Sequence, residues 1–162
     1  MSERMEGQTG LRVWIPLALV FLADRVTKYW VRGHMEIGES IAVVPDFFHL
    51  TYILNPGAAF GFLPRQKWLF VAAALIAVGA VIVFRRRIMA LPATVGCCAG
   101  LIAGGAAGNL FDRLTIGEVV DFLDFKIWSY IFNLADAVIV LSGFLLCLTV
   151  LREEKAGSAA KD

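Results

Sequence analysis

The stretch FNLADAVIVLSGFLLCLTVL, Phe132–Leu151, indicates a helix that crosses a membrane. It is almost wholly apolar and close to the ~20 residues that a helix needs to span a hydrocarbon core of about 30 Å. Asp136 nevertheless lies one turn into it, three residues after Asn133. A carboxylate at membrane depth costs a few kcal/mol or more, so it usually marks a cavity or a functional site.

The rest of the chain repeats this apolar pattern. Of the 162 residues, 59% are hydrophobic and 18% are charged, whereas a soluble domain carries about a quarter charged residues. The sequence therefore predicts an α-helical membrane protein, a single integral membrane domain over residues 1–162 with four transmembrane helices. The expected spans are 11–31, 68–84, 92–110 and 131–151.

Charge distribution predicts the orientation of these spans. An even number of crossings puts both termini on one side, together with the short basic turn at Arg85–Arg87. That side holds eight basic residues, against five in the longer loops opposite, and the positive-inside rule makes it cytoplasmic. Loops 32–67 and 111–130 are then extracytoplasmic. Runs of β-branched and aromatic residues in the first loop, broken at Pro45 and at Pro56, predict a small β-structured region.

Polar residues intrude on three of the four spans at one level, near their extracytoplasmic ends. In the third span, glycines at four-residue spacing form a ridge that ends next to these polar residues. Such a ridge lets a neighbouring helix approach closely. The glycines are Gly96, Gly100, Gly104 and Gly108. The polar residues are Asp24, Lys28, Asn109, Asp112, Arg113, Asn133 and Asp136, with Asp121 in the second loop.

Purely structural interpretations of these residues stay open. Asp24 and Lys28, four apart, form a possible helical ion pair. Asp112–Arg113 is a possible interfacial anchor. Asn133 is a favoured N-cap residue, and Asp136 would then occupy the third helical position, near the positive end of the helix dipole. These accounts explain less well why three helices offer acids at the same depth.

The side chains in the sequence limit the kinds of catalysis that we expect. The chain has no GxSxG motif, and its two histidines and three cysteines show no metal-ligand spacing, so we expect neither a metal nor a cofactor. Two neighbouring carboxyl groups cannot both ionise cheaply and therefore share a proton. One then acts as a base on water while the other polarises a carbonyl.

Five blocks of this sequence resemble the lipoprotein signal peptidases, that is the signal peptidase II family of bacterial membrane aspartic peptidases. They occur in the family's order and extend from the first expected span to the fourth. The blocks are DRVTK (24–28), NPGAAFG (55–61), GAAGNLFDR (105–113), VVDF (119–122) and FNLAD (132–136).

The resemblance implies a function and a set of site residues. It implies an endopeptidase of the inner membrane that removes the signal peptide before a diacylglyceryl-modified cysteine, with Asp121 and Asp136 as the catalytic pair. It also implies sensitivity to globomycin, and neither a cofactor nor a nucleic acid partner. Residues that would shape the site and hold substrate are Asp24, Lys28, Asn55, Gly57, Gly105, Asn109, Arg113 and Asn133.

Two other classes remain as alternatives. Intramembrane acids also mark ion paths, which makes a small ion- or proton-coupled transporter the runner-up. The inner halves of the spans are almost wholly apolar, however, and no inverted repeat is present. A structural subunit that uses the glycine ridge for helix packing is the third class, and it would tolerate replacement of both aspartates.

Overall fold

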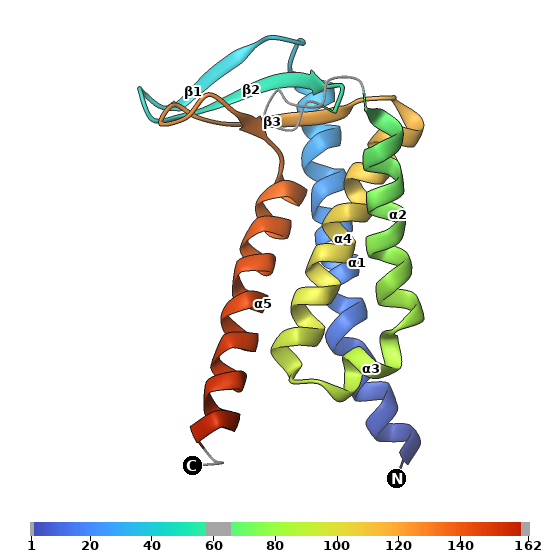
Figure 1. Ribbon diagram of the computed structural model, residues 1–162. Helices are drawn as coiled ribbons and strands as arrows, with labels where there is room; N and C mark the ends of the chain where they lie inside the picture. The colour runs from blue at the N-terminus through green and yellow to red at the C-terminus, as the bar shows by residue number, and fades with distance from the viewer. Residues whose placement is uncertain (1, 58–65, 160–162) are drawn as a thin grey trace.

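A computed structural model of the chain describes residues 2–57 and 66–159, with side-chain surroundings for 10–57 and 66–153. Four long helices run side by side, a small sheet covers one end of them, and both termini lie at the other end (Figure 1). The elements are α1 (Ser2–His34), β1 (Ser40–Val44), β2 (Phe48–Asn55), α2 (Lys67–Val83), α3 (Arg85–Ala90), α4 (Ala93–Thr115), β3 (Val119–Phe125), β4 (Ile131–Phe132) and α5 (Leu134–Ala159).

Each of the four long helices overlaps one expected span, but most of their ends differ from the expected ones. α4 continues to Thr115, five residues beyond the expected end, and α5 begins only at Leu134 because residues 131–132 form β4. Hydropathy locates the apolar part of a helix, whereas the helix itself continues wherever its backbone hydrogen bonds do. The basic turn likewise contains a short helix, α3. Residues 58–61 of the NPGAAFG block lie outside the described residues.

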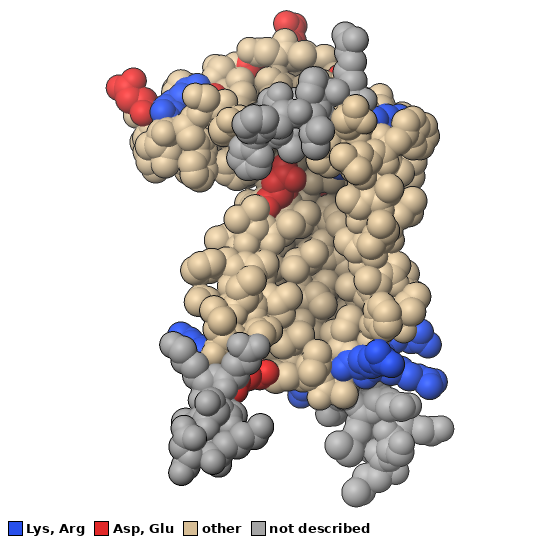
Figure 2. Space-filling model, in the orientation of Figure 1, with Lys and Arg blue, Asp and Glu red and all other residues tan. Residues whose placement is uncertain are grey.

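By length and apolar composition, two described helices could cross a membrane, α4 and the part Leu134–Glu153 of α5. α2 is apolar but has only 17 residues, and α1 carries Arg12, Asp24, Arg25 and Lys28 along its length. This criterion therefore leaves the prediction of four crossings unconfirmed. On the face shown in Figure 2, most of the surface between the sheet and the end that carries the basic turn is tan, so few charged side chains lie there.

The sheet confirms the β-structured region and adds the second loop to it. Its four strands are antiparallel in the order β1-β2-β3-β4, with Asp121 of β3 opposite Ile53 of β2. One cluster of buried side chains joins the sheet to the end of α1, namely Val31, Met35, Tyr52, Val120 and Phe122. Between α4 and β3 the chain turns at Gly117, whose φ of +96° is a conformation that glycine adopts without strain.

The glycine ridge of α4 lies close to a neighbouring helix, as expected, and that helix is α1. A Cβ added at Gly100 would lie 3.2 Å from the Cα of Val13, and one at Gly108 would lie 3.0 Å from the side-chain carbon of Asp24. Gly105 faces α5 instead, where a Cβ would come within 2.9 Å of the Ala135 carbonyl oxygen. Small residues thus allow α4 to contact both helices that carry acidic site residues.

Candidate active site

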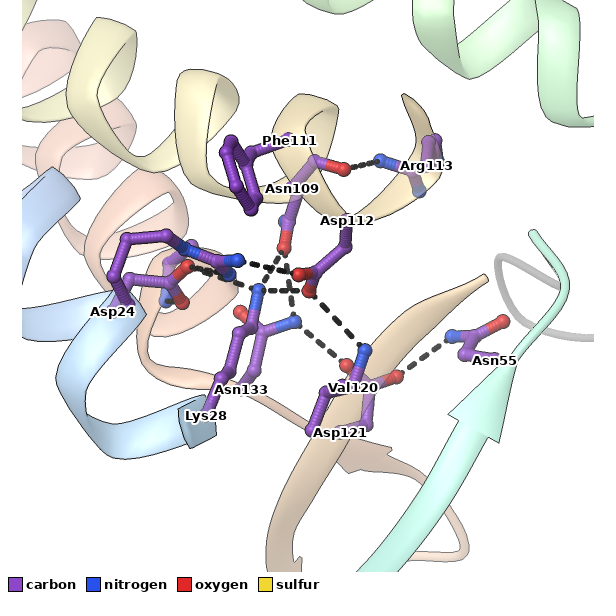
Figure 3. A network of polar contacts seen from close by, with 12 residues as sticks. Asp24, Lys28, Asn55, Asn109, Phe111, Asp112, Arg113, Val120, Asp121 and Asn133 are labelled. Atoms are coloured by element: carbon purple, nitrogen blue, oxygen red, sulfur yellow. Dashed lines mark hydrogen bonds and ion pairs between the residues drawn. The ribbon is translucent and has the colours of Figure 1, made fainter. Parts of the chain in front are cut away.

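A cluster of four charged side chains, three of them buried and Arg25 partly exposed, joins α1 to α4 (Figure 3). The ammonium of Lys28 lies 3.0 Å from Asp24 and 2.9 Å from Asp112. Arg25 contacts the same two carboxylates, at 2.8 Å and 2.6 Å respectively. Lys28 and both aspartates are at most 1% exposed. Two cations balance two anions, as burial requires, because an unpaired buried charge would be strongly destabilising.

Asn109 connects this ion cluster to Asp136 at the start of α5. Lys28 donates a hydrogen bond to Asn109 Oδ1 at 2.7 Å, and Asn109 Nδ2 donates to Asp136 Oδ1 at 2.7 Å. An ammonium group only donates hydrogen bonds, so it fixes which end of the amide is the oxygen. The Asn109 amide therefore directs its NH₂ group towards Asp136.

Asn133 connects the two carboxylates to each other. Its Nδ2 donates to Asp121 Oδ1 at 2.6 Å and to Asn109 Oδ1 at 3.1 Å. Its Oδ1 accepts the main-chain N–H of Asp136 at 3.0 Å, and Asp136 Oδ2 accepts the main-chain N–H of Asn133 at 3.4 Å. This reciprocal pair is a capping box at the start of α5, with aspartate in the place of the usual glutamate or glutamine. The predicted helix cap is thus confirmed, and the capping residue also contacts Asp121.

Asn55 holds the second oxygen of Asp121 from β2. Its Nδ2 donates to Asp121 Oδ2 at 2.8 Å, while its Oδ1 accepts the main-chain N–H of Gly57 at 3.0 Å. Gly57 has a φ of +100°, and a Cβ there would lie 3.1 Å from the ring of Phe70. Only glycine fits this position without strain or displacement. Asp121 is fully buried and receives a donor on each oxygen.

The environment of Asp121 raises the affinity of its carboxylate for a proton. Burial is the largest cause, followed by the negative charge of Asp136, and together they raise the pKa of Asp121 from 3.8 to about 7. Hydrogen bonds from Asn55 and Asn133, and then the charge of Lys28, act in the opposite direction and lower this pKa. A carboxyl group that titrates near neutral pH can both give and accept a proton under cellular conditions.

Most of the residues named from sequence meet in this one network, namely Asp24, Lys28, Asn55, Asn109, Asp121, Asn133 and Asp136. Gly57 and Gly105 shape the surrounding backbone. Arg113 lies apart from the ion cluster (Figure 3). Its guanidinium donates to the main-chain oxygen of Asn109 at 3.4 Å and lies 4.9 Å from the centre of the Phe70 ring.

Sequence reasoning did not assign Arg25 or Asp112 to the site. Both were visible in the blocks DRVTK and GNLFDR. Asp112 follows Asn109 by three residues and therefore shares its helical face, which was a usable signal. Arg25 follows Asp24 directly, and adjacent helical residues point in different directions, so its long side chain gave no such signal.

The described part of the site offers carboxyl, amide, ammonium and guanidinium groups. Within residues 2–57 and 66–159, no group of three His, Cys, Asp or Glu side chains could hold a metal ion. Asp121 and Asp136 both contact Asn133, so two carboxyl groups lie in one hydrogen-bonded site, and such a pair is able to transfer protons.

Comparison with known proteins gives a consistent result. A family model described as "Signal peptidase (SPase) II" matches residues 17–152. The lipoprotein signal peptidase of Desulfitobacterium hafniense is 48% identical over 143 residues, which cover 88% of this chain and 95% of that protein. That of Pelotomaculum thermopropionicum is 49% identical over 146 residues, 90% of this chain and 95% of its own.

A solved structure described as a bacterial membrane enzyme, determined at 2.3 Å resolution, is also similar. It shares 33% of its sequence with this chain and superimposes with a TM-score of 0.77, covering 86% of this chain and 87% of its own. Fold and comparisons together define a membrane-embedded aspartic peptidase. More particularly, the chain belongs to the signal peptidase II family, whose curated relatives are lipoprotein signal peptidases.

Proposed function

We propose that this protein cleaves the signal peptide from prolipoproteins, directly before a diacylglyceryl-modified cysteine, and that Asp121 and Asp136 jointly activate the attacking water. The observation that carries the proposal is the bridge through Asn133, which donates from its side chain to Asp121 and from its main chain to Asp136. The bridge brings a carboxylate from the sheet to one from a helix in a buried, hydrogen-bonded site.

In this mechanism the two carboxyl groups hold one proton between them. The ionised group removes a proton from water, whose oxygen attacks the scissile carbonyl carbon, while the protonated group donates to the carbonyl oxygen. Collapse of the tetrahedral intermediate breaks the C–N bond. The amino group of the cysteine leaves with a proton from the pair, and one hydroxyl of the intermediate returns a proton to the pair as the new carboxyl group forms. The groups titrate as a unit, so neither is assigned a fixed role.

The remaining site residues support the pair from outside it. Asn55, Asn109 and Asn133 each present an amide NH₂ to a catalytic carboxylate. Asp24 and Lys28 belong to the ion cluster that holds Asn109 in place. Gly57 and Gly105 permit the close backbone approaches, and Arg113 lies at the edge of the site, where it could contact a substrate carbonyl.

The proposed membrane arrangement is one domain with four crossings. Both termini face the cytoplasm, and the sheet and the site lie near the outer leaflet of the bacterial inner membrane. In support, the site residues surround Asp121 of β3 and the start of α5. The short helix α3 of the basic turn lies at the opposite end of the helices, with the termini (Figure 1). A substrate whose lipid and signal helix already lie in the bilayer could then enter sideways between the helices.

The substrate class follows from the same proposal. Lipidated prolipoproteins are the partners, globomycin is the expected inhibitor, and neither a cofactor nor a nucleic acid takes part. Inhibition of the purified enzyme by globomycin tests this assignment apart from the catalytic residues.

The decisive experiment measures cleavage of a lipidated prolipoprotein peptide by purified Asp121→Asn and Asp136→Asn variants. Each should remain folded, as judged by thermal unfolding, yet lose turnover by a factor of about a thousand or more, since acid–base catalysis contributes roughly 10²–10⁴-fold. Asp46→Asn, the same change at an exposed turn residue, is the control and should retain full activity. A folded Asn variant at either site with more than about a tenth of wild-type turnover would refute the pair.

A further inference from the structure

Asp112 fixes the path of the chain from α4 to Asp121 at two points. Its main-chain oxygen accepts the N–H groups of Ile116, at 2.7 Å, and of Gly117, at 3.2 Å, and so closes the end of α4. Its side-chain Oδ2 accepts the main-chain N–H of Val120 at 3.3 Å. Val120 immediately precedes Asp121, so one residue of α4 holds both the turn and the start of the strand.

The contact from Asp112 lies in the first half of β3, which β4 does not reach. β2 runs along one side of β3, but β4 pairs with the other side only at Leu123 and Asp124. At Val120 the carboxylate of Asp112 takes the place of a neighbouring strand. An error in the strand position here would turn Asp121 away from Asn133, because successive side chains of a strand point to opposite faces.

Arg25 in turn holds the Asp112 carboxylate. One nitrogen of its guanidinium lies 2.6 Å from Asp112, the other lies 2.8 Å from Asp24, and the group stacks 4.9 Å from the centre of the Phe111 ring. A planar fork suits two carboxylates better than a lysine ammonium does. Lys28 also contacts Asp112, but its ammonium group is shared with Asp24 and Asn109.

We propose that Arg25 and Asp112 form a positioning pair that sets the place and the charge environment of Asp121 through the main chain of Val120. The inference rests on the proposed catalytic role of Asp121. Neither residue touches the reacting atoms. Their effect is on the rate of the chemical step rather than on substrate binding.

Arg25 and Asp112 carry opposite charges, so removing one or the other should shift the pKa of Asp121 in opposite directions. This difference separates a positioning role from a role in stability alone. The charged groups that act on Asp121 directly are Lys28 from α1, Arg113 from α4 and Asp136 from α5. Asp24 and Arg25 from α1 and Asp112 from α4 act through their ion pairs in the cluster around Lys28. Asp112→Asn removes a negative charge and leaves Lys28 less neutralised, which lowers the pKa of Asp121. Arg25→Gln removes a positive charge and raises this pKa. General loosening of the fold would move both variants in the same direction.

The test measures kcat, KM and the pH dependence of kcat/KM for Arg25→Gln, Arg25→Lys, Asp112→Asn and the double variant Arg25→Gln/Asp112→Asn. Arg32→Gln, an exposed arginine on the same helix, is the matched control. We expect kcat to fall about tenfold or more in both Gln and Asn variants, with KM within about twofold. The basic limb of the pH profile should move down for Asp112→Asn and up for Arg25→Gln, and the double variant should return towards wild type. Arg25→Lys should retain more kcat than Arg25→Gln.

Three results would overturn the inference. One is a wild-type kcat in folded Arg25→Gln. Another is displacement of both pH profiles in the same direction, and the third is a lowered unfolding temperature with kcat per folded enzyme unchanged. Should Asp112→Asn fail to fold, the two Arg25 variants still decide the outcome. An active Asp121→Asn enzyme would instead refute the proposed function, so the two failures are separable.

Discussion

The side-chain nitrogen of Asn133 lies 2.6 Å from Oδ1 of Asp121. Asn133 is also the residue whose side-chain oxygen caps α5. One side-chain amide therefore caps a helix with its oxygen and holds a carboxylate on a strand with its nitrogen. Substitution can separate these two functions.

Asn133→Ser should retain the helix cap and lose the contact with Asp121. Serine is a good N-cap residue, so we expect a nearly unchanged unfolding temperature together with a kcat at least tenfold lower. Asn133→Ala should lose about 1 kcal/mol of stability in addition, because it also removes the cap. Thermal unfolding and turnover of both purified variants provide the comparison. Wild-type turnover by Asn133→Ser would show that the amide is not needed at Asp121.

Activity should decline as the pH rises through about 7. The proposed mechanism needs one proton on the carboxyl pair, and burial and then Asp136 raise the pKa of Asp121 to about 7, so this proton is lost above that pH. The measurement is kcat/KM between pH 5 and 9, with circular dichroism to confirm folding throughout. Asn133→Ser removes a hydrogen bond that lowers this pKa, so its decline should occur at higher pH. A flat profile up to pH 9 would contradict the assignment.

Gly108→Ala should destabilise the protein and also reduce turnover. The new Cβ would lie 3.0 Å from the side-chain carbon of Asp24, which would displace Asp24 from its contacts with Arg25 and Lys28. Overpacking of this kind costs about 1–3 kcal/mol. Gly79→Ala in α2 is the control, because a Cβ there has no neighbour within 4 Å and alanine favours the helix by roughly 0.5–1 kcal/mol. Equal stability of the two variants would argue against close packing at Gly108.

Chelation should leave the activity intact. The proposed chemistry uses only the two carboxyl groups and water, and the described residues provide no cluster of metal ligands. Cleavage of the lipidated peptide should therefore be the same with and without millimolar EDTA. Loss of activity that added zinc restores would overturn this prediction.

Much of the architecture was predictable because lipid imposes a simple rule on sequence. A membrane-crossing helix must be apolar for about 20 residues, and the search for such stretches found part of each of the four long helices, although four crossings stay a prediction. The regular spacing of Gly96–Gly108 similarly indicated a face for close helix contact, and that face lies against α1. The end of α4 at Thr115 was not predictable, because Asp112 and Arg113 are polar yet belong to the helix.

The sequence predicted which residues belong to the site better than it predicted which of them contact one another. The common depth of Asp24, Asn109 and Asp136 followed from their places in the spans. The contact of Asp121 with Asn133 depends on the pairing of β3 with β2, and strand pairing between distant loops leaves little trace in a single sequence. The position of Arg25 was hidden for a different reason, since a flexible side chain can reach partners on either side of its helix. The catalytic role of Asp121 and Asp136 stays a prediction.

α5 is attached to the other helices mainly near the end that carries Asp136. Its buried residues among Leu134–Glu153 are Ala135 and Ser142, and only 11% of its apolar window is buried, against 50% for α4. Because few side chains bury the rest of α5, we expect it to tilt without moving the cap at Asn133. Bilayers differ in thickness, and tilting is a low-cost response to that mismatch. We expect the site geometry to be the same in thin and thick membranes, since the adjustment takes place at the far end of one helix.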